Sequence, residues 1–305
     1  MIPTSPLDHH DVLALVHAAL REDLRYGGDL TVRACVPAGA RLGGEILAKG
    51  AGTICGLWLF PVVFAALAED RPGAGVTVTD LAVDGAVVPA GTIIGRVSGS
   101  AATILSGERT ALNLAQHLSG IATATAALVA IVAGTRAKVL DTRKTVPGLR
   151  VLAKHAVVCG GGVNHRFGLH DQILIKNNHI ALARGRSQAG PQTCAAAEAV
   201  RRARSAVGPA ITIQVEIDQV TDLAPVIAAG ADLVLLDNFD PHGAAQAVAE
   251  RDRIDPARRV LLEASGGITA ASIRAFAEAG VDRISTGAIT HSVKALDIAL
   301  HCAPE

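Results

Sequence analysis

The fold class is most evident in Asp232-Leu233-Val234-Leu235-Leu236-Asp237, a short aliphatic run that ends in a carboxylate. Five similar short aliphatic runs lie beyond residue 136, at 137–141, 172–176, 211–216, 260–263 and 283–285. Alanine-rich stretches typical of helices separate most of them, for example 193–206 and 270–279. Strands that alternate with helices predict a parallel sheet, either open or closed into a barrel.

The first half of the chain has a different residue pattern. Residues 41–99 hold short runs of Val, Ile and Thr between glycines, and the runs at 43–48 and 91–97 predict strands of a small antiparallel sheet. Residues 106–133 then predict a helix, because Leu112, Leu118, Leu128 and Val132 recur at helical spacing. We therefore expect a mixed N-terminal domain followed by a βα-repeat domain.

Charge and composition exclude several classes of partner. Lys plus Arg and Asp plus Glu number 28 each, so the 305-residue chain has no net charge to attract nucleic acid or a membrane surface. Five cysteines without a Cys-x-x-Cys pair indicate neither a zinc ribbon nor a disulfide framework. The start lacks a secretory pattern, and the apolar run 54–68 is too short to span a bilayer. We expect a cytoplasmic protein with no membrane segment.

Polar residues end nearly every strand of the repeat. In a βα barrel the carboxyl ends of the strands meet at one mouth, where substrates bind. Each such residue alone could merely face water, but together they predict a site. The residues collected there are Asp141, Arg143, Lys144, Lys176, Glu216, Asp237, Glu263, Ser265, Ser285 and Thr286.

Positive charge is concentrated in three of these segments. Arg143 and Lys144 follow one strand, His165 and Arg166 precede another, and Lys176 ends it. Arginine grips carboxylates and phosphates in bidentate fashion, and lysine acts as a compact charge. The set predicts a ligand with several anionic groups. Surface ion pairs with Asp141 and Asp171 could instead explain one or two of the cations.

Two glycine loops follow the last two predicted strands. Ser265-Gly266-Gly267 and Ser285-Thr286-Gly287-Ala288 each precede a predicted helix, and backbone amides at such a point suit a phosphate group. Glu216 and Asp237 could hold ribose hydroxyls, bind a metal through water, or stabilise positive charge on a sugar carbon. Each could equally pair with a nearby lysine.

Several longer motifs resemble the quinolinate phosphoribosyltransferase family. They are Glu-Arg-Thr-Ala-Leu-Asn at 108–113, Asp-Thr-Arg-Lys-Thr-Val-Pro-Gly-Leu-Arg at 141–150, Gly-Gly-Gly-Val-Asn-His-Arg-Phe-Gly-Leu at 160–169 and Ile-Lys-Asn-Asn-His at 175–179. The likeness extends from Glu22 to Ala288, almost the whole chain. The blocks at 141–150 and 160–169 are long enough to be highly specific.

The resemblance implies an α/β architecture of two domains. The N-terminal open α+β sandwich would cover 1–115, with a C-terminal helix at about 291–305 packed on it. An α/β barrel with fewer strands than the eight-stranded form would cover 116–290 and carry the active site. The resemblance also implies a homodimer whose active sites are shared between subunits. Residues 184–194 look like an insertion near the mouth.

The resemblance further implies the reaction of quinolinate with phosphoribosyl pyrophosphate and Mg²⁺. The products would be nicotinate mononucleotide, pyrophosphate and carbon dioxide, in NAD biosynthesis. Arg143, His165 and Arg166 would hold the two carboxylates of quinolinate, and Arg109 would reach in from the other subunit. Lys144 and Lys176 would bind carboxylate or pyrophosphate oxygens.

The remaining implied roles concern the sugar. Glu216 and Asp237 would contact ribose hydroxyls and hydrated magnesium, and with Lys144 they form the expected catalytic set. The sugar phosphate would lie in the glycine loops, on Ser265, Gly266, Gly267, Thr286, Gly287 and Ala288.

Three alternatives stay open. The first is the phosphoribosyltransferase paralogue found with molybdenum transport, which is expected to lack the 164–166 block in this form. The second makes Lys176 the Schiff-base lysine of a phosphosugar aldolase. The third is a barrel that only binds a sugar phosphate, which leaves the arginines without a purpose.

Overall fold

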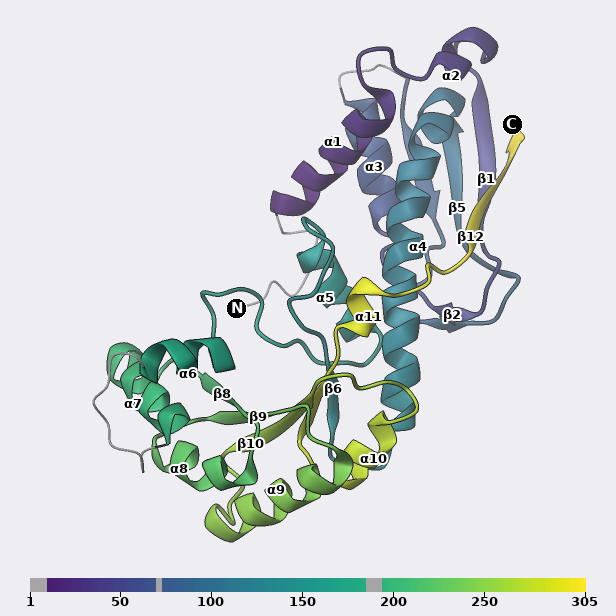
Figure 1. Ribbon diagram of the computed structural model, residues 1–305. Helices are drawn as coiled ribbons and strands as arrows, with labels where there is room; N and C mark the ends of the chain where they lie inside the picture. Colours follow the sequence, from purple (N-terminus) through teal and green to yellow (C-terminus); the bar gives the residue numbers. More distant parts are fainter. Residues whose placement is uncertain (1–9, 70–72, 185–193) are drawn as a thin grey trace. The chain divides into compact units, whose positions relative to one another are not determined.

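The computed structural model describes residues 10–69, 73–184 and 194–305 and divides into two compact units. Unit 1 holds the chain up to Ala126, the segment Thr145–Gly161 and the C-terminal segment Ile289–Glu305. Unit 2 holds Ala127–Lys144 and Gly162–Ala288. Figure 1 shows the elements of both. The expected insertion at 184–194 lies almost wholly outside the described residues.

Unit 1 contains a four-stranded antiparallel sheet in the order β12-β1-β5-β3. Its strands are β1 (Arg41–Ala48), β3 (Val76–Thr79), β5 (Thr92–Ser100) and β12 (Ile298–Pro304). The buried side chains include Ile46 and Ala48 on β1 and Ile94 and Val97 on β5. The strands predicted at 43–48 and 91–97 are thus confirmed. A short ladder pairs β2 (Gly52–Thr53) with β4 (Val87–Val88).

The predicted C-terminal helix at 291–305 is wrong, because residues 298–304 form the edge strand β12. Gly44 of β1 is the register partner of Cys302, and a Cβ atom on Gly44 would meet the Cys302 sulfur at 2.7 Å. The two strands come from opposite ends of the chain. A partner so distant in sequence leaves no trace in local periodicity, which is why the short apolar run Ile298-Ala299-Leu300 did not reveal a strand.

The described residues of unit 1 also form helices. They are α1 (His10–Leu24), α2 (Leu30–Cys35), α3 (Leu59–Ala68), α5 (Arg150–Cys159) and most of α4 (Ala101–Ile131). Asp29 caps α2 by accepting the Val32 N–H. The short α11 (Ala288–His291) begins at the last residue of unit 2 and continues into unit 1.

Helix α4 is long and apolar enough to cross a membrane by length and composition alone. Its contacts identify it as a core helix of unit 1. A Cβ on Gly107 would lie 3.0 Å or less from Phe64 and Leu67 of α3, and the Ser119 hydroxyl accepts the Cys55 N–H at 3.0 Å. The small residues of α4 therefore serve close packing within the folded unit.

Unit 2 contains six parallel strands in the order β6-β11-β10-β9-β8-β7. They are β6 (Lys138–Leu140), β7 (Ile173–Ile175), β8 (Ile213–Ile217), β9 (Leu233–Asp237), β10 (Leu261–Ser265) and β11 (Arg283–Ser285). All six predicted strands are present, and the part of unit 2 that the structure describes has fewer strands than an eight-stranded barrel, as expected. Val163 adds a parallel bridge to Leu140 at the outer edge of β6.

Helices flank the strands of unit 2, as Figure 1 shows. They are α6 (Asn177–Arg184), α7 (Ala195–Val207), the 3₁₀ turn η2 (Val220–Asp222), α8 (Leu223–Ala228), α9 (Pro241–Ile254) and α10 (Ile273–Glu278). The fully buried Arg251 ties α9 to the sheet, because its guanidinium donates to the Val260 carbonyl at 2.8 Å and to Asp282 at 2.7 Å.

Candidate active site

The strand register of unit 2 brings polar residues to one level of the sheet. Glu216 pairs with Leu235, Leu235 with Glu263, and Glu263 with Arg283. Asp237 pairs with Ser265, two residues closer to the carboxyl ends. Since alternate residues of a strand share a face, these side chains belong to the same face of the sheet. The sequence-based grouping at the strand ends is thus reproduced within unit 2.

A buried cluster of His165, Glu263 and Arg283 lies at this level. The Glu263 side chain has no exposed surface, and its oxygens lie 3.3 Å from His165 Nε2 and 2.9 Å from Arg283 Nε. Burial alone would raise the pKa of Glu263. His165, Arg283 and Ser285 together outweigh it and hold the pKa below its usual value. Glu263 therefore remains a carboxylate at neutral pH inside unit 2.

His165 also fixes the segment that carries Arg166. The His165 N–H donates to the buried Asp141 carboxylate at 2.9 Å, and His165 Nδ1 accepts the Arg166 N–H at 2.7 Å. Both ring nitrogens of His165 thus face protein groups. In this arrangement the ring positions the 164–166 segment. Its predicted direct contact with a substrate stays a prediction.

The two arginines of the candidate site influence each other electrostatically. Burial and the positive charge of Arg143 lower the pKa of Arg166, while Asp171 opposes the shift. Arg166 Nη1 donates to the Gln172 carbonyl at 3.1 Å. The Asp171 carboxylate accepts the Phe167 and Gly168 N–H groups at 2.5 and 2.9 Å, which hold its own pKa low against burial. Two guanidiniums kept close in this way favour an anionic ligand.

The two lysines lie on loops and are exposed. The Lys144 N–H donates to the Thr142 hydroxyl at 3.0 Å, within the loop after β6. Lys176 follows β7, and its Nζ atom lies 3.7 Å from Glu216 Oε2. Glu216 Oε1 accepts the Asn177 N–H at 3.4 Å. The alternative prediction for Glu216, a pair with a nearby lysine, is therefore confirmed, and its contact with ribose or a metal stays a prediction.

A cavity of about 740 Å³ opens beside Glu216. Its wall includes Asn177 of α6, Asp218 and Gln219 after β8, and Asp222. Asp237 is half-buried, and Asn238 donates to it at 3.0 Å. Glu216 and Asp237 lie on adjacent strands and share a face, and their predicted part in holding a hydrated metal ion stays a prediction. Oxygen ligands of this kind are those that Mg²⁺ prefers.

The first glycine loop has a backbone that only glycine adopts easily. Gly266 has a φ of +102°, and a Cβ there would lie 2.4 Å from Asn238 Oδ1. The helix predicted after this loop at 270–279 is present as α10, but it begins only at Ile273, after a turn in which the Ser272 hydroxyl accepts the Thr269 N–H at 3.1 Å. Any anion there would be held by loop amides rather than by a helix end.

The second glycine loop is tied to β6. The Thr286 N–H donates to the Leu140 carbonyl at 3.1 Å, and the Thr286 hydroxyl accepts the Ala288 N–H at 3.3 Å. Here the short α11 follows at once, as predicted. The loop is therefore held at the carboxyl ends of β6 and β11.

Arg109 belongs to unit 1 and not to unit 2. It lies on α4, its side chain is 61% exposed, and it is 4.0 Å from Glu108. Its expected entry into a partner's active site stays a prediction.

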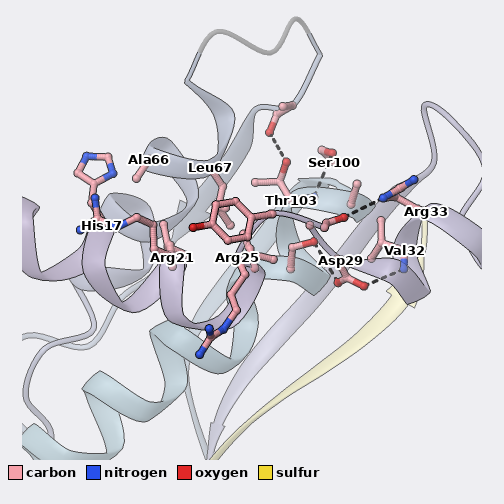
Figure 2. A pocket seen from close by; sticks show the side chains of 18 residues that line it. His17, Arg21, Arg25, Asp29, Val32, Arg33, Ala66, Leu67, Ser100 and Thr103 are labelled. Atoms are coloured by element: carbon pink, nitrogen blue, oxygen red, sulfur yellow. Dashed lines mark hydrogen bonds between the residues drawn. The ribbon is translucent and has the colours of Figure 1, made fainter.

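Sequence reasoning did not single out a basic cavity of about 630 Å³ in unit 1 (Figure 2). Arg21, Arg25 and Arg33 line it. Two of its charged side chains already bond to neighbouring protein groups. The Asp29 carboxylate accepts the Val32 N–H and the Ser106 hydroxyl, and the Arg33 guanidinium donates to the Gly27 carbonyl at 2.8 Å. In the sequence, the arginines at 21, 25 and 33 were the signal that could have indicated this basic cavity.

Comparison with known proteins agrees with this arrangement. The family description "Quinolinate phosphoribosyl transferase, N-terminal domain" matches residues 29–119, and "Quinolinate phosphoribosyl transferase, C-terminal domain" matches residues 121–301. The nicotinate-nucleotide pyrophosphorylase [carboxylating] of Mycobacterium leprae is 43% identical over 285 residues, 93% of this chain and 95% of that protein. A probable enzyme of the same name from Bacillus subtilis is 44% identical over 257 residues, 84% of this chain and 82% of its own.

Solved structures extend the likeness to three dimensions. The nicotinate-nucleotide pyrophosphorylase from Francisella tularensis superposes with a TM-score of 0.83 at 36% identity, and 99% of each chain is covered. The two-domain architecture is thus shared along the whole length. The chain belongs to the quinolinate phosphoribosyltransferase family.

Proposed function

We propose that this chain transfers the phosphoribosyl group of phosphoribosyl pyrophosphate to quinolinate with decarboxylation, in NAD biosynthesis. Nicotinate mononucleotide, pyrophosphate and carbon dioxide are the products. The names of the relatives support this activity. The observation that carries the proposal is that the positive charge of Arg143 helps to lower the pKa of Arg166, because two neighbouring guanidiniums suit a ligand with two carboxylates.

Quinolinate binding is assigned to the cationic segments of unit 2. Arg143 and Arg166 hold the two carboxylates, with Lys144 and Lys176 as further cations for carboxylate or pyrophosphate oxygens. His165 positions Arg166 through its ring and its buried partner Glu263. Charge-assisted hydrogen bonds of this type supply both affinity and orientation.

The ribose and the metal are assigned to the neighbouring carboxylates. Glu216 and Asp237 contact ribose hydroxyls and would hold Mg²⁺ through water, consistent with their shared face. Bound magnesium would neutralise charge on the pyrophosphate. The loops 265–267 and 286–288 receive the sugar phosphate on their amides.

The reaction then depends mainly on position and charge. As the bond from the anomeric carbon to pyrophosphate lengthens, positive charge develops on the sugar, and Glu216 and Asp237 stabilise it. The quinolinate nitrogen donates its electron pair to that carbon. The resulting pyridinium accepts the electrons of the adjacent carbon–carboxylate bond, and a proton replaces the carbon dioxide that leaves. The positive charge of the Lys144 side chain stabilises the departing pyrophosphate.

The assembly and compartment follow from the same proposal. A homodimer would let Arg109 of one subunit complete the site of the other, and a cytoplasmic location suits a reduced chain with five free cysteines.

A single incubation distinguishes the candidate activities. The chain is mixed with quinolinate labelled in the carboxylate that is lost, phosphoribosyl pyrophosphate and Mg²⁺, and labelled carbon dioxide and pyrophosphate are measured together. Equal release of both supports the proposal. Release of neither, with tight binding of sugar phosphates, supports a binding barrel. Trapping of Lys176 by borohydride with a keto sugar phosphate would support the aldolase reading.

A further inference from the structure

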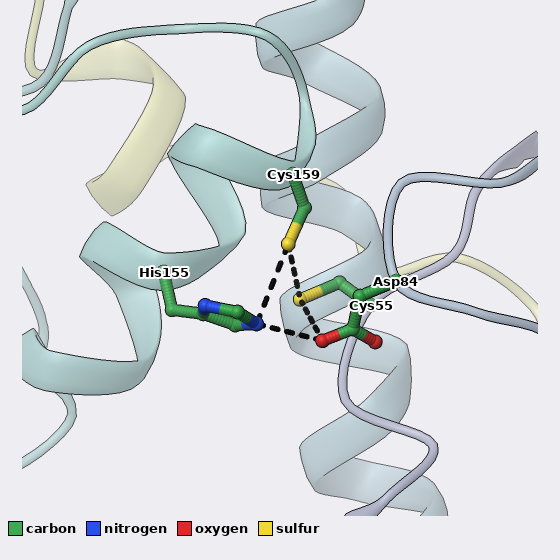
Figure 3. A group of neighbouring side chains, drawn as sticks. All are labelled: Cys55, Asp84, His155 and Cys159. Atoms are coloured by element: carbon green, nitrogen blue, oxygen red, sulfur yellow. Dashed lines mark hydrogen bonds and ion pairs between the residues drawn. The ribbon is translucent and has the colours of Figure 1, made fainter. Parts of the chain in front are cut away.

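Four side chains of types that can bind a metal ion converge in unit 1 (Figure 3). Cys55 follows β2, Asp84 lies between β3 and β4, and His155 and Cys159 are on α5. One ligand atom from each lies within 4.8 Å of all the others. The sequence analysis found no metal motif here, because the four residues come from three separate segments.

The distances among these atoms approach those of a tetrahedral zinc site. Zn–S bonds of about 2.3 Å place two sulfurs about 3.8 Å apart, and a sulfur and an imidazole nitrogen about 3.6 Å apart. The Cys55 and Cys159 sulfurs are 3.7 Å apart, and Cys159 Sγ is 3.4 Å from His155 Nε2. Cys55 Sγ is 3.9 Å from Asp84 Oδ2.

The distance between His155 and Asp84 is shorter than two zinc ligands would have. His155 Nε2 lies 2.6 Å from Asp84 Oδ2, which is a hydrogen bond. A metal ion would replace this bond and move the two atoms apart by less than 1 Å, to about 3.3 Å. The remaining ligand atoms lie within 4.8 Å of one another, so they too would move by only roughly 1 Å to reach tetrahedral spacing.

Helix geometry and hydrogen bonds from neighbouring residues position these side chains. His155 and Cys159 are four residues apart on α5 and therefore share one helix face. The Asp84 carboxylate accepts the Gly56 N–H at 2.8 Å and the Trp58 indole N–H at 3.1 Å. Hydrogen bonds from outside the cluster orient metal ligands in this way in known sites.

We propose that Cys55, Asp84, His155 and Cys159 bind one Zn²⁺ ion as a structural site. Two thiolates, an imidazole and a carboxylate complete a four-coordinate shell, so no position is left open for catalysis. Thiolates also select zinc over the magnesium of the proposed reaction. A simple disulfide between Cys55 and Cys159 would leave the convergence of His155 and Asp84 without a purpose.

The ion would fasten α5 to the rest of unit 1. Helix α5 lies in the sequence between Lys144 and Arg166, but it belongs to unit 1 with Cys55 and Asp84. Zinc would join these three segments and stabilise the folded chain by its binding free energy. The proposal does not depend on the activity proposed above.

The test uses the purified full-length chain, kept reduced. The parent, Cys55→Ser and Cys159→Ser are compared with Cys35→Ser and Cys302→Ser, whose cysteines are exposed and outside the cluster. After zinc loading and dialysis, we expect one zinc per chain in the parent and both controls. The affinity should fall at least tenfold in the two cluster variants. Cobalt substitution should show thiolate-to-metal charge-transfer bands of two-thiolate intensity, with tetrahedral ligand-field bands, only where both thiols remain.

Folding is checked separately. Circular dichroism and the thermal midpoint are recorded with and without zinc, and His155→Gln provides a variant that keeps both thiols. Zinc should raise the midpoint of the parent and the controls, but not that of Cys159→Ser or His155→Gln. A reduced parent that retains no zinc and gives no tetrahedral cobalt spectrum overturns the proposal. So does equal zinc uptake by folded Cys159→Ser.

Discussion

His165 Nε2 lies 3.3 Å from Glu263 Oε1, at a point in unit 2 where the Glu263 side chain has no exposed surface. The same carboxylate holds Arg283 Nε at 2.9 Å. Through the His165 ring, which accepts the Arg166 N–H, the buried charge of Glu263 is linked to the arginine proposed to bind quinolinate. Stability and substrate affinity should therefore respond together to changes at Glu263.

Glu263→Gln should destabilise the chain by about 3 kcal/mol at neutral pH, because it removes the charge that pairs with buried groups. The pKa of Glu263 is lowered in the folded chain, so its contribution is complete above the usual carboxyl pKa and is lost as the pH falls through the folded value. Urea unfolding at a series of pH values should show the difference between parent and variant shrinking in acid. Glu278→Gln, which removes an exposed pair with Arg274, should cost less than about 1 kcal/mol. A pH-independent difference would contradict the assignment.

Arg143→Ala and Arg166→Ala should each weaken quinolinate binding by about 10- to 100-fold, since a charge-assisted hydrogen bond contributes roughly 1.5–3 kcal/mol. Isothermal titration measures the affinity, and thermal unfolding checks that the fold persists. Arg201→Ala is the matched control, because its guanidinium pairs with Glu198 on the exposed face of α7. Unchanged affinity in both site variants would remove the arginines from the quinolinate site.

Lys144→Ala should slow turnover more than it weakens substrate binding, because the exposed ammonium is proposed to meet charge that develops on the leaving pyrophosphate. Single-turnover rates and equilibrium dissociation constants separate the two effects. Lys138→Ala, at the opposite end of β6, should leave both unchanged. A rate equal to that of the parent would exclude Lys144 from the catalytic set.

Gly266→Ala should raise the KM for phosphoribosyl pyrophosphate and lower stability by about 1–3 kcal/mol, because of its φ of +102° and the close approach of Asn238. Gly208→Ala has a similar positive φ but no neighbour within 4 Å, so it should affect stability alone. Steady-state kinetics on both variants make the comparison. Equal KM values in Gly266→Ala and the parent would count against a phosphate cradle at this loop.

Dialysis against magnesium-free buffer should abolish turnover, and added Mg²⁺ should restore it. Glu216→Gln should need at least about tenfold more Mg²⁺ for half-maximal rate, since a neutral amide binds the hydrated ion less well. Glu198→Gln, on α7 and paired only with surface arginines, serves as the control. The measurement is a magnesium titration of the initial rate. Identical titrations would argue that Glu216 does not help to hold the metal.

The sequence predicted best what depends on local pattern. A short aliphatic run such as Leu233–Asp237 can be recognised as a strand from its own residues. In a parallel βα repeat the carboxyl ends of the strands lie at the same edge of the sheet, so the polar residues that end the strands lie there together. Glu216, Glu263 and Asp237 were grouped correctly for that reason. The long apolar helix α4 was likewise evident from the spacing of its leucines.

Contacts between segments far apart in the sequence could not be predicted from local pattern. Strand β12 forms because β1 offers a free edge, and the Cys55, Asp84, His155 and Cys159 cluster forms because α5 returns to unit 1. The four-residue spacing of His155 and Cys159 can be read in the sequence, but the helix that puts them on one face was not predicted. The engagement of His165 by Glu263 also depends on β10, far away in sequence.

The decisive experiment is a crystal structure of the chain with quinolinate. We expect both carboxylates of quinolinate within hydrogen-bond distance of the Arg143 and Arg166 guanidiniums, with the ring nitrogen directed toward Glu216 and Asp237. Quinolinate bound elsewhere, with those arginines directed into solvent, would contradict this expectation.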